Sequence, residues 1–225
     1  RKIRPVPAAK YFKGEGFLKT AVTFRRSRIA VIGVEGHIDP GESRRSQTGR
    51  TVTGAETVVR FLDHAAESRR VRAIVMRIDS PGGSALGSDL IWRKVHLVRK
   101  RKPVVASFGD VAASGGYYIA APASHIVAEP TSITGSIGVL SGKFVARELL
   151  RRLAVGRESV QRGAHAQLDS LFSEFTAEEA ERLYGQMQEF YREDFLKKVA
   201  EGRDLTAEAV DGVGRGRVWS GARAR

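Results

Sequence analysis

Short apolar strands that alternate with helical segments are the feature that most restricts how this chain can fold. Four short apolar runs predict strands, at residues 29–34, 71–78, 103–108 and 126–127. The spacing of apolar or small residues predicts helices, at residues 53–67, 84–101 and 111–121. Strands that are apolar throughout are typical of parallel sheets, so the pattern predicts an α/β fold whose mainly parallel sheet is covered on both faces.

The segments outside this alternation are predicted to be polar loop and further helix. Residues 39–53 are polar and glycine-containing, which favours a loop, and a short helix is expected at 144–153. Thr176 followed by Glu179 predicts a capping box, and apolar residues recur behind it at helical spacing. The last third of the chain is therefore expected to be mostly helical.

The net charge of +13, with 38 Lys+Arg against 25 Asp+Glu, is unevenly distributed. Residues 1–28 hold nine basic residues and one acidic residue, so they carry +8 and the other 197 residues carry +5. We interpret residues 1–28 as a basic linker or lead-in segment, which could lie near anionic lipid headgroups. Residues 29–225 are interpreted as one domain that carries the candidate site residues. No nucleic-acid partner is predicted, because no basic face is rich in aromatic residues.

Several kinds of chemistry are excluded by composition. The chain has no cysteine, which excludes disulfides, thiolate-bound zinc, iron–sulfur clusters and a cysteine nucleophile. The spacing of His, Asp and Glu predicts no metal site, and no cofactor is expected. No apolar run approaches the roughly 18 residues of a membrane span.

The chain begins with Arg, and we expect it to be a piece of a longer polypeptide, truncated at its C-terminal end as well.

Two glycine-rich turns follow predicted strands, at the edge of the sheet where ligand-binding and active sites usually lie. The first is the sequence Asp-Ser-Pro-Gly-Gly at 79–83. The second contains Ser114, which is flanked only by Ala and Gly at a predicted helix start. Adjacent glycines let backbone amides approach a negative oxygen, and a serine nucleophile needs open access and a neighbouring N–H. Either turn alone is also compatible with tight packing.

Three segments together resemble the signatures of the signal peptide peptidase A (protease IV) family, in the same order and with similar spacing. They are Ser-Pro-Gly-Gly at 80–83, Ala-Ala-Ser-Gly-Gly-Tyr-Tyr-Ile at 112–119 and Thr-Gly-Ser-Ile-Gly-Val at 134–139. A further segment, 216–221, resembles one near the family's C-terminal end. The resemblance covers about residues 29–225 and implies a Clp protease/crotonase-like superhelical repeat of strands and helices that carries a Ser/Lys dyad.

The resemblance also implies roles for individual residues. Ser114 matches the nucleophile, and Gly83 matches a residue whose amide forms the oxyanion hole together with an amide near Ser114, assigned here to Gly115. Ser136 matches a serine that hydrogen-bonds the catalytic lysine. Substrate binding is assigned to two neighbouring glycines: Gly82 and Gly116.

The catalytic lysine is missing from the place where single-domain members of the family carry it. There the lysine follows a Gly-Ala-His-like segment, but the same segment at 163–165 is followed here by Ala166. We therefore expect the serine-bearing C-terminal half of a two-domain member, with the lysine supplied by the N-terminal domain of the same polypeptide. His165 and Lys143 are weaker candidates for the base. A triad of His165 with Asp79 or Asp110 is disfavoured, because Asp beside glycine is typically a turn residue.

The expected function is that of a serine endopeptidase that degrades cleaved signal peptides and other short apolar peptides. The resemblance implies a homo-oligomer at the bacterial inner membrane, with the active domain on the periplasmic side. Two alternatives stay open. One is an inactive homologue that binds peptides or supports assembly, and the other is a crotonase-like acyl-CoA enzyme.

Overall fold

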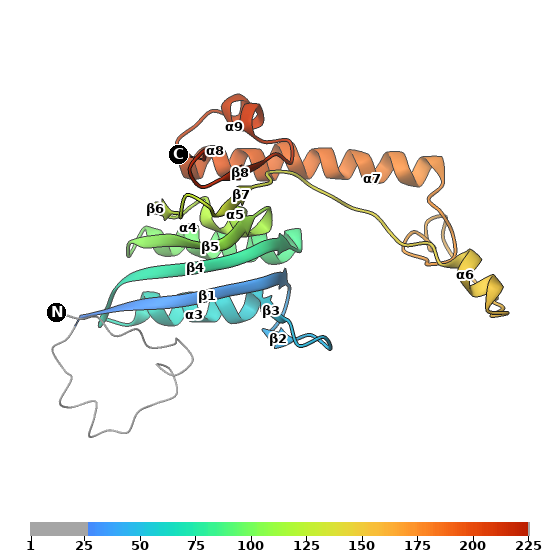
Figure 1. Cartoon of the computed structure of the whole chain (residues 1–225), viewed down its shortest axis with the longest axis horizontal. Coiled ribbons are helices and arrows are strands. Elements are labelled where there is room, and N and C mark those ends of the chain that lie inside the picture. Colours follow the sequence, from blue (N-terminus) through green and yellow to red (C-terminus); the bar gives the residue numbers. More distant parts are fainter. Residues whose placement is uncertain (1–26, 225) are drawn as a thin grey trace, which may run out of the picture. The chain divides into compact units, whose positions relative to one another are not determined.

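The structure is a computed structural model that describes residues 27–224, so the predicted segment 1–28 lies almost wholly outside the described residues. The described chain divides into two compact units (Figure 1). The first comprises residues up to 138 and from 195 onward, and the second comprises residues 139–194.

The first unit is built on one eight-stranded sheet. Its strands are β1 (Arg28–Asp39), β2 (Arg44–Arg45), β3 (Thr51–Gly54), β4 (Val71–Gly83), β5 (Val104–Ala113), β6 (His125–Val127), β7 (Ile133–Gly135) and β8 (Val218–Ser220). The strand order is β2-β3-β1-β4-β5-β7-β8, and β6 also pairs with β5. Only the β2–β3 and β7–β8 pairs are antiparallel. The predicted α/β fold with a mainly parallel sheet is confirmed.

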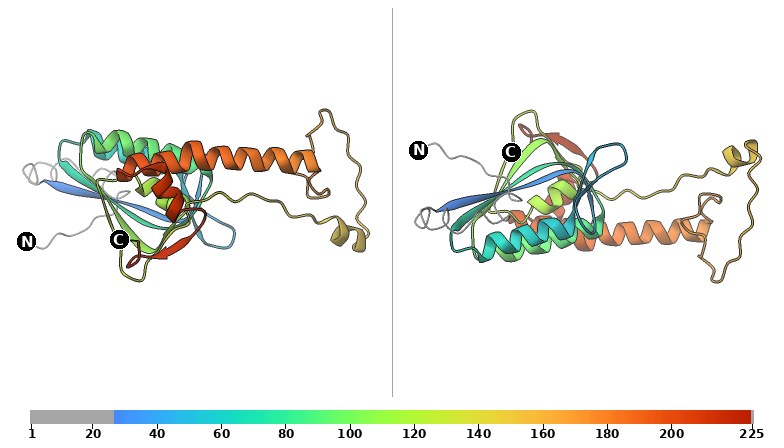
Figure 2. Two further views of the ribbon diagram at one scale, coloured as in Figure 1. Left: turned by 90° about the horizontal axis from the view of Figure 1, so that it is seen from above. Right: turned by 90° about the horizontal axis from the view of Figure 1, so that it is seen from below.

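Helices of the first unit cover one face of this sheet rather than both. Figure 2 shows α3 (Ala55–Glu67) and α4 (Ala85–Arg99), in cyan and green, on the same side of it. Burial alternates along β4: Ile74 and Met76 are buried, whereas Arg77 is exposed. The prediction of a sheet covered on both faces is therefore wrong for the described residues. It failed because small and β-branched residues also occupy the open face, where Ile29 is 48% exposed.

Two strands run further than their apolar cores predict. β4 continues through the glycine turn to Gly83, and β5 continues to Ala113, where a helix had been expected from residue 111. The residues at the end of β5 pair with β7, Val111 with Ile133 and Ala113 with Gly135. Pairing with a strand 22 residues further along the chain therefore overrides the weak local preference of small residues. The helix begins only at α5 (Gly115–Ala120).

The C-terminal segment returns to the first unit. It comprises the π-helical η1 (Phe190–Leu196), then α8 (Lys197–Arg203) and α9 (Ala207–Val213), and ends in β8. Phe195, Leu196 and Val199 are buried there, and β8 runs antiparallel beside β7. The segment that closes the edge of the sheet is therefore the one that resembles the family's C-terminal signature.

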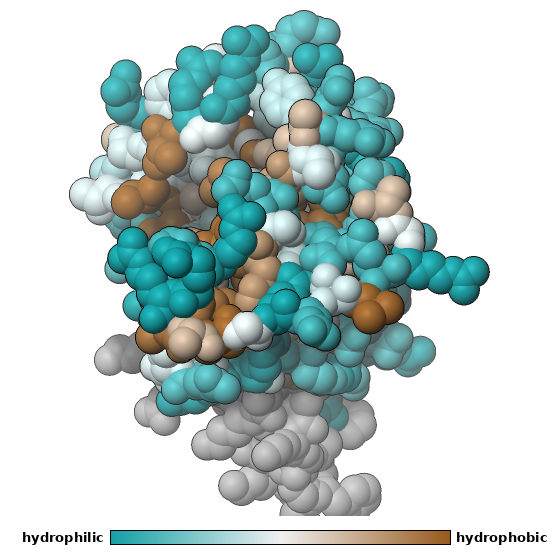
Figure 3. All heavy atoms as spheres, turned by 90° about the vertical axis from the view of Figure 1, so that its right-hand side faces the viewer, coloured by the Kyte–Doolittle hydropathy of each residue, from teal (hydrophilic) through white to brown (hydrophobic). Residues whose placement is uncertain are grey.

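The second unit contains α6 (Arg147–Arg152) and α7 (Ala177–Glu189), so the helix expected at 144–153 is shorter than predicted. The capping box is confirmed: Glu179 N donates to Thr176 Oγ1 at 3.2 Å, and Thr176 N donates to the Glu179 carboxylate at 2.9 Å. Large apolar side chains of this unit are exposed, among them Leu140 and Phe144. Figure 3 shows brown hydrophobic side chains interspersed with teal hydrophilic ones on one face of the molecule. Among residues 27–224, no helix has the length and apolar character to cross a membrane.

Candidate active site

The residues predicted for catalysis follow the carboxyl ends of neighbouring parallel strands. Gly82 and Gly83 end β4, Ser114 follows β5, and Ser136 follows β7. The register places these ends together, because Ser80 pairs with Ala112 and Ala113 pairs with Gly135. This is the edge of an open parallel sheet at which ligands bind.

Ser114 has a backbone conformation that few non-glycine residues adopt, with φ 50° and ψ −120°. Such a conformation is costly and persists only where the surroundings hold it. Ser114 N donates to Gly135 O at 2.9 Å, and Tyr118 N donates to Ser114 O at 2.8 Å. The side chain is half-buried, and its Oγ has no hydrogen bond to any residue between 27 and 224. Ser114 is thus held rigidly by its backbone, while its hydroxyl is available for reaction.

Gly82 and Gly115 have to be glycines because the backbones of the two turns touch. A Cβ on Gly82, where φ is +102°, would lie 2.5 Å from Gly115 N and 3.0 Å from Ser114 Cβ. A Cβ on Gly115 would clash with Ser88 Oγ and lie 3.2 Å from Gly83 N. The amide nitrogens of Gly83 and Gly115 are thereby brought together beside Ser114.

The direction of the Gly83 N–H follows from the sheet register. Gly83 pairs with Ile38 of β1, and Ile38 O accepts from Ser84 N at 2.7 Å. Alternate residues of a parallel strand bond to the same neighbour, so the Gly83 N–H points away from β1, to the side on which β5 lies. Gly115 begins α5, so its own N–H has no acceptor within that helix. Two donors facing the region beside Ser114 are what an oxyanion hole requires.

Ser80 holds this turn in place, a role that sequence reasoning missed. It is fully buried; its Oγ donates to Gly36 O at 2.6 Å and accepts from Gly82 N at 3.1 Å. The contact to Gly36 spans 44 residues, so no local pattern could reveal it. Asp79 was expected to be a cap or turn residue, but it lies within β4, and its Oδ1 accepts from Val111 N of β5 at 3.1 Å, so it links two strands.

Ser136 directly follows β7, the strand that pairs with the end of β5 before Ser114, and it also has a positive φ, 49°. Its N–H donates to Arg217 O at 2.7 Å, which ties it to the segment leading into β8. A Cβ on Gly135 would lie 2.8 Å from Trp219 Cδ1, so the Trp219 ring packs against the turn. Sequence reasoning noted the 216–221 segment but not that it supports Ser136.

The glycines assigned to substrate binding occupy different surroundings. Gly82 faces Ser114, as a substrate-contacting residue would. Gly116 is buried, and a Cβ there would lie 2.6 Å from Ser80 O, so it packs α5 against the end of β4. The role of both residues in substrate binding stays a prediction.

No lysine of residues 27–224 hydrogen-bonds Ser114 or Ser136. Four of these lysines are held elsewhere: Lys94 by Asp63, Lys102 by the carbonyls of Ala65 and Ser68, Lys143 by the carbonyl of Leu168, and Lys198 by Asp89. The described residues therefore bring together the hydroxyl of Ser114, two amide donors and a second serine, with no lysine of residues 27–224 bonded to either serine.

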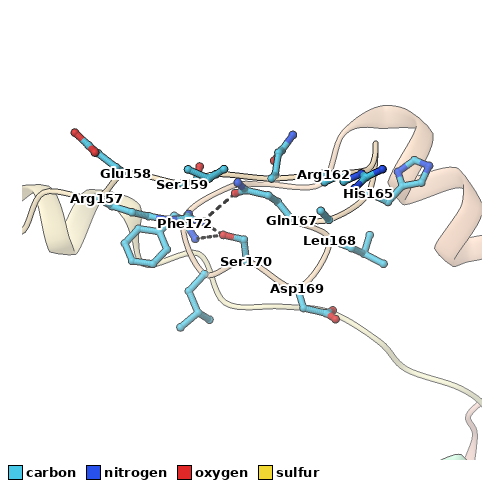
Figure 4. A pocket seen from close by; sticks show the side chains of 14 residues that line it. Arg157, Glu158, Ser159, Arg162, His165, Gln167, Leu168, Asp169, Ser170 and Phe172 are labelled. Atoms are coloured by element: carbon cyan, nitrogen blue, oxygen red, sulfur yellow. Dashed lines mark hydrogen bonds between the residues drawn. The ribbon is translucent and has the colours of Figure 1, made fainter.

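The segment in which single-domain members carry the lysine lies in the second unit. His165 there lies 3.7 Å from the Glu179 carboxylate. Residues 157–162 and 165–172 line an open hollow (Figure 4), in which the Arg157 guanidinium donates to Ser170 at 2.9 Å and to Gln167 at 3.1 Å. His165, a weaker candidate for the base, lines the hollow, whereas Ser114, Ser136 and the glycines predicted for the site do not.

A strained serine at a strand end, facing two glycine amides at a helix start, defines the class of serine acyl-transfer sites on α/β sheets. The comparisons with known proteins agree with it. A model of peptidase family S49 matches residues 96–225. The chain belongs to peptidase family S49, which confirms the resemblance to the signal peptide peptidase A family.

Two relatives illustrate the extent of this similarity. The chain is 36% identical to the chloroplastic serine protease SPPA of Arabidopsis thaliana over 222 residues, 98% of this chain and 33% of that protein. It is 35% identical to protease 4 of Haemophilus influenzae over 197 residues, 87% of this chain and 31% of that protein. The chain thus spans about a third of the length of these relatives.

Proposed function

We propose that this chain carries the nucleophile of a serine endopeptidase whose general base is a lysine of another domain. One observation carries the proposal: the unbonded hydroxyl of a strained Ser114 lies beside the converging amides of Gly83 and Gly115. No cofactor is needed for this chemistry.

In the proposed reaction, Ser114 Oγ attacks the carbonyl carbon of a peptide bond. Its proton passes to the amine of the lysine, and the amides of Gly83 and Gly115 stabilise the negative oxygen of the tetrahedral intermediate. The C–N bond then breaks, and the leaving amine takes the proton. Water hydrolyses the resulting ester, which releases the acid and restores Ser114.

A lysine from the N-terminal domain of the same polypeptide is the proposed base. Ser136 supports this role, because its side chain has no hydrogen bond within the described part of the chain and it directly follows β7, whose end pairs with the residues before Ser114. A lysine that approached both serines would lose water, which lowers its pKa and keeps the amine neutral enough to accept a proton. Relatives about three times as long as this chain have room for such a domain.

The proposed substrates are signal-peptide remnants and other short apolar peptides. The proposed setting is a homo-oligomer at the bacterial inner membrane, with the active domain on the periplasmic side. The second unit supports both, because it exposes Leu140, Phe144 and other large apolar side chains. Exposed apolar side chains of this size are available to contact apolar peptides, lipid or another chain.

A fluorophosphonate reagent, which modifies activated serines, tests the proposal. Residues 1–225 alone are expected to react slowly, and the complete polypeptide is expected to react and to cleave an apolar peptide. Ser114→Ala should abolish both activities. Rapid hydrolysis by residues 1–225 alone, lost in Ser114→Ala, would show that the base lies in this chain. A complete polypeptide that binds peptides but neither reacts nor cleaves would favour the binding or assembly role.

A further inference from the structure

Tyr118 is linked directly to the backbone of Ser114. It lies one helical turn further along α5, and its N–H donates to Ser114 O at 2.8 Å. This bond closes the first turn of the helix onto a residue whose own backbone is strained. Any displacement of Tyr118 is therefore passed to the predicted nucleophile.

The Tyr118 side chain is held by a cluster on two other helices. Its hydroxyl donates to Asp89 Oδ1 of α4 at 2.9 Å, and the ammonium of Lys198 of α8 pairs with the same oxygen. That ammonium also lies 5.0 Å from the ring centre of Trp92 and 5.6 Å from that of Tyr118. The ring of Phe195 packs edge-on against Tyr118, with 4.8 Å between the ring centres.

The hydrogen-bonding and charged groups of this cluster hold the Tyr118 side chain in place. Tyr118 is 1% exposed, and its burial raises the pKa of the hydroxyl, which stays protonated and donates to the carboxylate. The Asp89 and Lys198 side chains are 34% and 20% exposed, so both charges are partly removed from water. A hydrogen bond to a charged partner in such surroundings is stronger and more directional than one between neutral groups.

We propose that Tyr118, held by Asp89 and Lys198, is a positioning residue for the nucleophile Ser114. Helices α4 and α8 thereby set the orientation of the first turn of α5, and through it the angle at which Ser114 leaves β5. The inference rests on the proposed function, because it assigns Tyr118 a part in placing the reacting hydroxyl.

Tyr118→Phe tests the inference, since it removes only the hydroxyl and keeps the ring. In the complete polypeptide the maximal rate of fluorophosphonate modification is expected to fall on the order of tenfold, because small misplacements of a reacting group are costly. The reagent concentration at half-maximal rate should not change. Lys198→Met is expected to act in the same direction. Tyr117→Phe is the matched control: its hydroxyl has no hydrogen bond within residues 27–224, and the rate should be that of the native protein.

Hydrogen exchange on residues 1–225 gives a readout that does not depend on activity. In Tyr118→Phe, the amide of residue 118 is expected to exchange about tenfold faster, while amides at the centre of β4 keep their native rates. Unchanged modification in a stable Tyr118→Phe protein would overturn the inference, and so would unchanged exchange at that amide. If the native complete polypeptide is not modified at all, the proposed function fails, and the exchange measurement alone decides whether Tyr118 holds the Ser114 turn.

Discussion

The two units of this chain are stabilised in different ways. Every buried apolar side chain of residues 27–224 belongs to the first unit, where the glycines at 82–83 and 115–116 also bring strand ends into backbone contact. In residues 139–194 the single buried side chain is that of Glu179, and local contacts predominate, such as the capping box and the hydrogen bonds of Arg157. The first unit can therefore place reacting atoms accurately, whereas the second presents exposed surface.

Glycine substitutions are expected to show the largest difference in stability effect between the two units. Gly82→Ala forces a Cβ to within 2.5 Å of Gly115 N at a φ of +102°, so we expect a loss of about 3 kcal/mol in the free energy of unfolding. Fluorophosphonate modification of the complete polypeptide should also be lost. Gly142→Ala in the second unit is the control, because a Cβ there meets nothing within 4 Å. Urea unfolding measures the free energy of unfolding of both variants. Equal losses in Gly82→Ala and Gly142→Ala would contradict the contrast between the two units.

Ser80→Ala should affect reaction and stability together. It leaves Gly36 O and Gly82 N without their hydroxyl partner, at an expected cost of about 1–3 kcal/mol of unfolding free energy. Because the same hydroxyl orients the turn that ends in Gly83, modification of Ser114 is expected to slow by about 10- to 100-fold.

Ser132→Ala provides the comparison for Ser80→Ala. Ser132 is likewise buried, and its Oγ donates to Gly109 O at 2.7 Å. Its loss should lower stability by a similar amount without slowing modification. If the two variants slow the reaction equally, Ser80 acts only through stability.

The second unit should respond to acid through its capping box. The backbone N–H of Thr176 donates to Glu179 and lowers the pKa of that carboxyl below its ordinary value of 4.5. A lowered pKa in the folded state means that the carboxylate stabilises α7 above pH 4.5, and that this stabilisation is lost as the pH falls through the folded value. Hydrogen exchange in the first turn of α7, corrected for intrinsic rates, is expected to accelerate severalfold over that range.

Glu179→Gln should make this exchange less dependent on pH, whereas Glu181→Gln, outside the capping box, should leave the acceleration in place. Exchange that responds to acid equally in both variants would show that the capping box does not stabilise the start of α7. Amides of the first unit serve as the internal reference.

The features that can be predicted from the sequence also differ along the chain. The strand starts, the mainly parallel sheet and the capping box can be predicted because they depend on local apolar spacing and on side chains three residues apart. The end of β5 cannot, because Val111–Ala113 join the sheet only by pairing with β7. The support of the site by Ser80 depends on a contact across 44 residues. Ser114 was found through its flanking glycines, but its strained backbone is visible only in the folded chain.

Ser88→Ala should have the smallest effect. Its Oγ is buried against Gly115 and has no hydrogen-bond partner within residues 27–224, so removing it leaves no acceptor unsatisfied. The free energy of unfolding should stay within about 1 kcal/mol of the native value or rise, in contrast to the loss expected for Ser132→Ala. Urea unfolding of the two variants decides this. A loss as large as that of Ser132→Ala would mean that the Ser88 hydroxyl has a partner, such as a buried water beside Gly115.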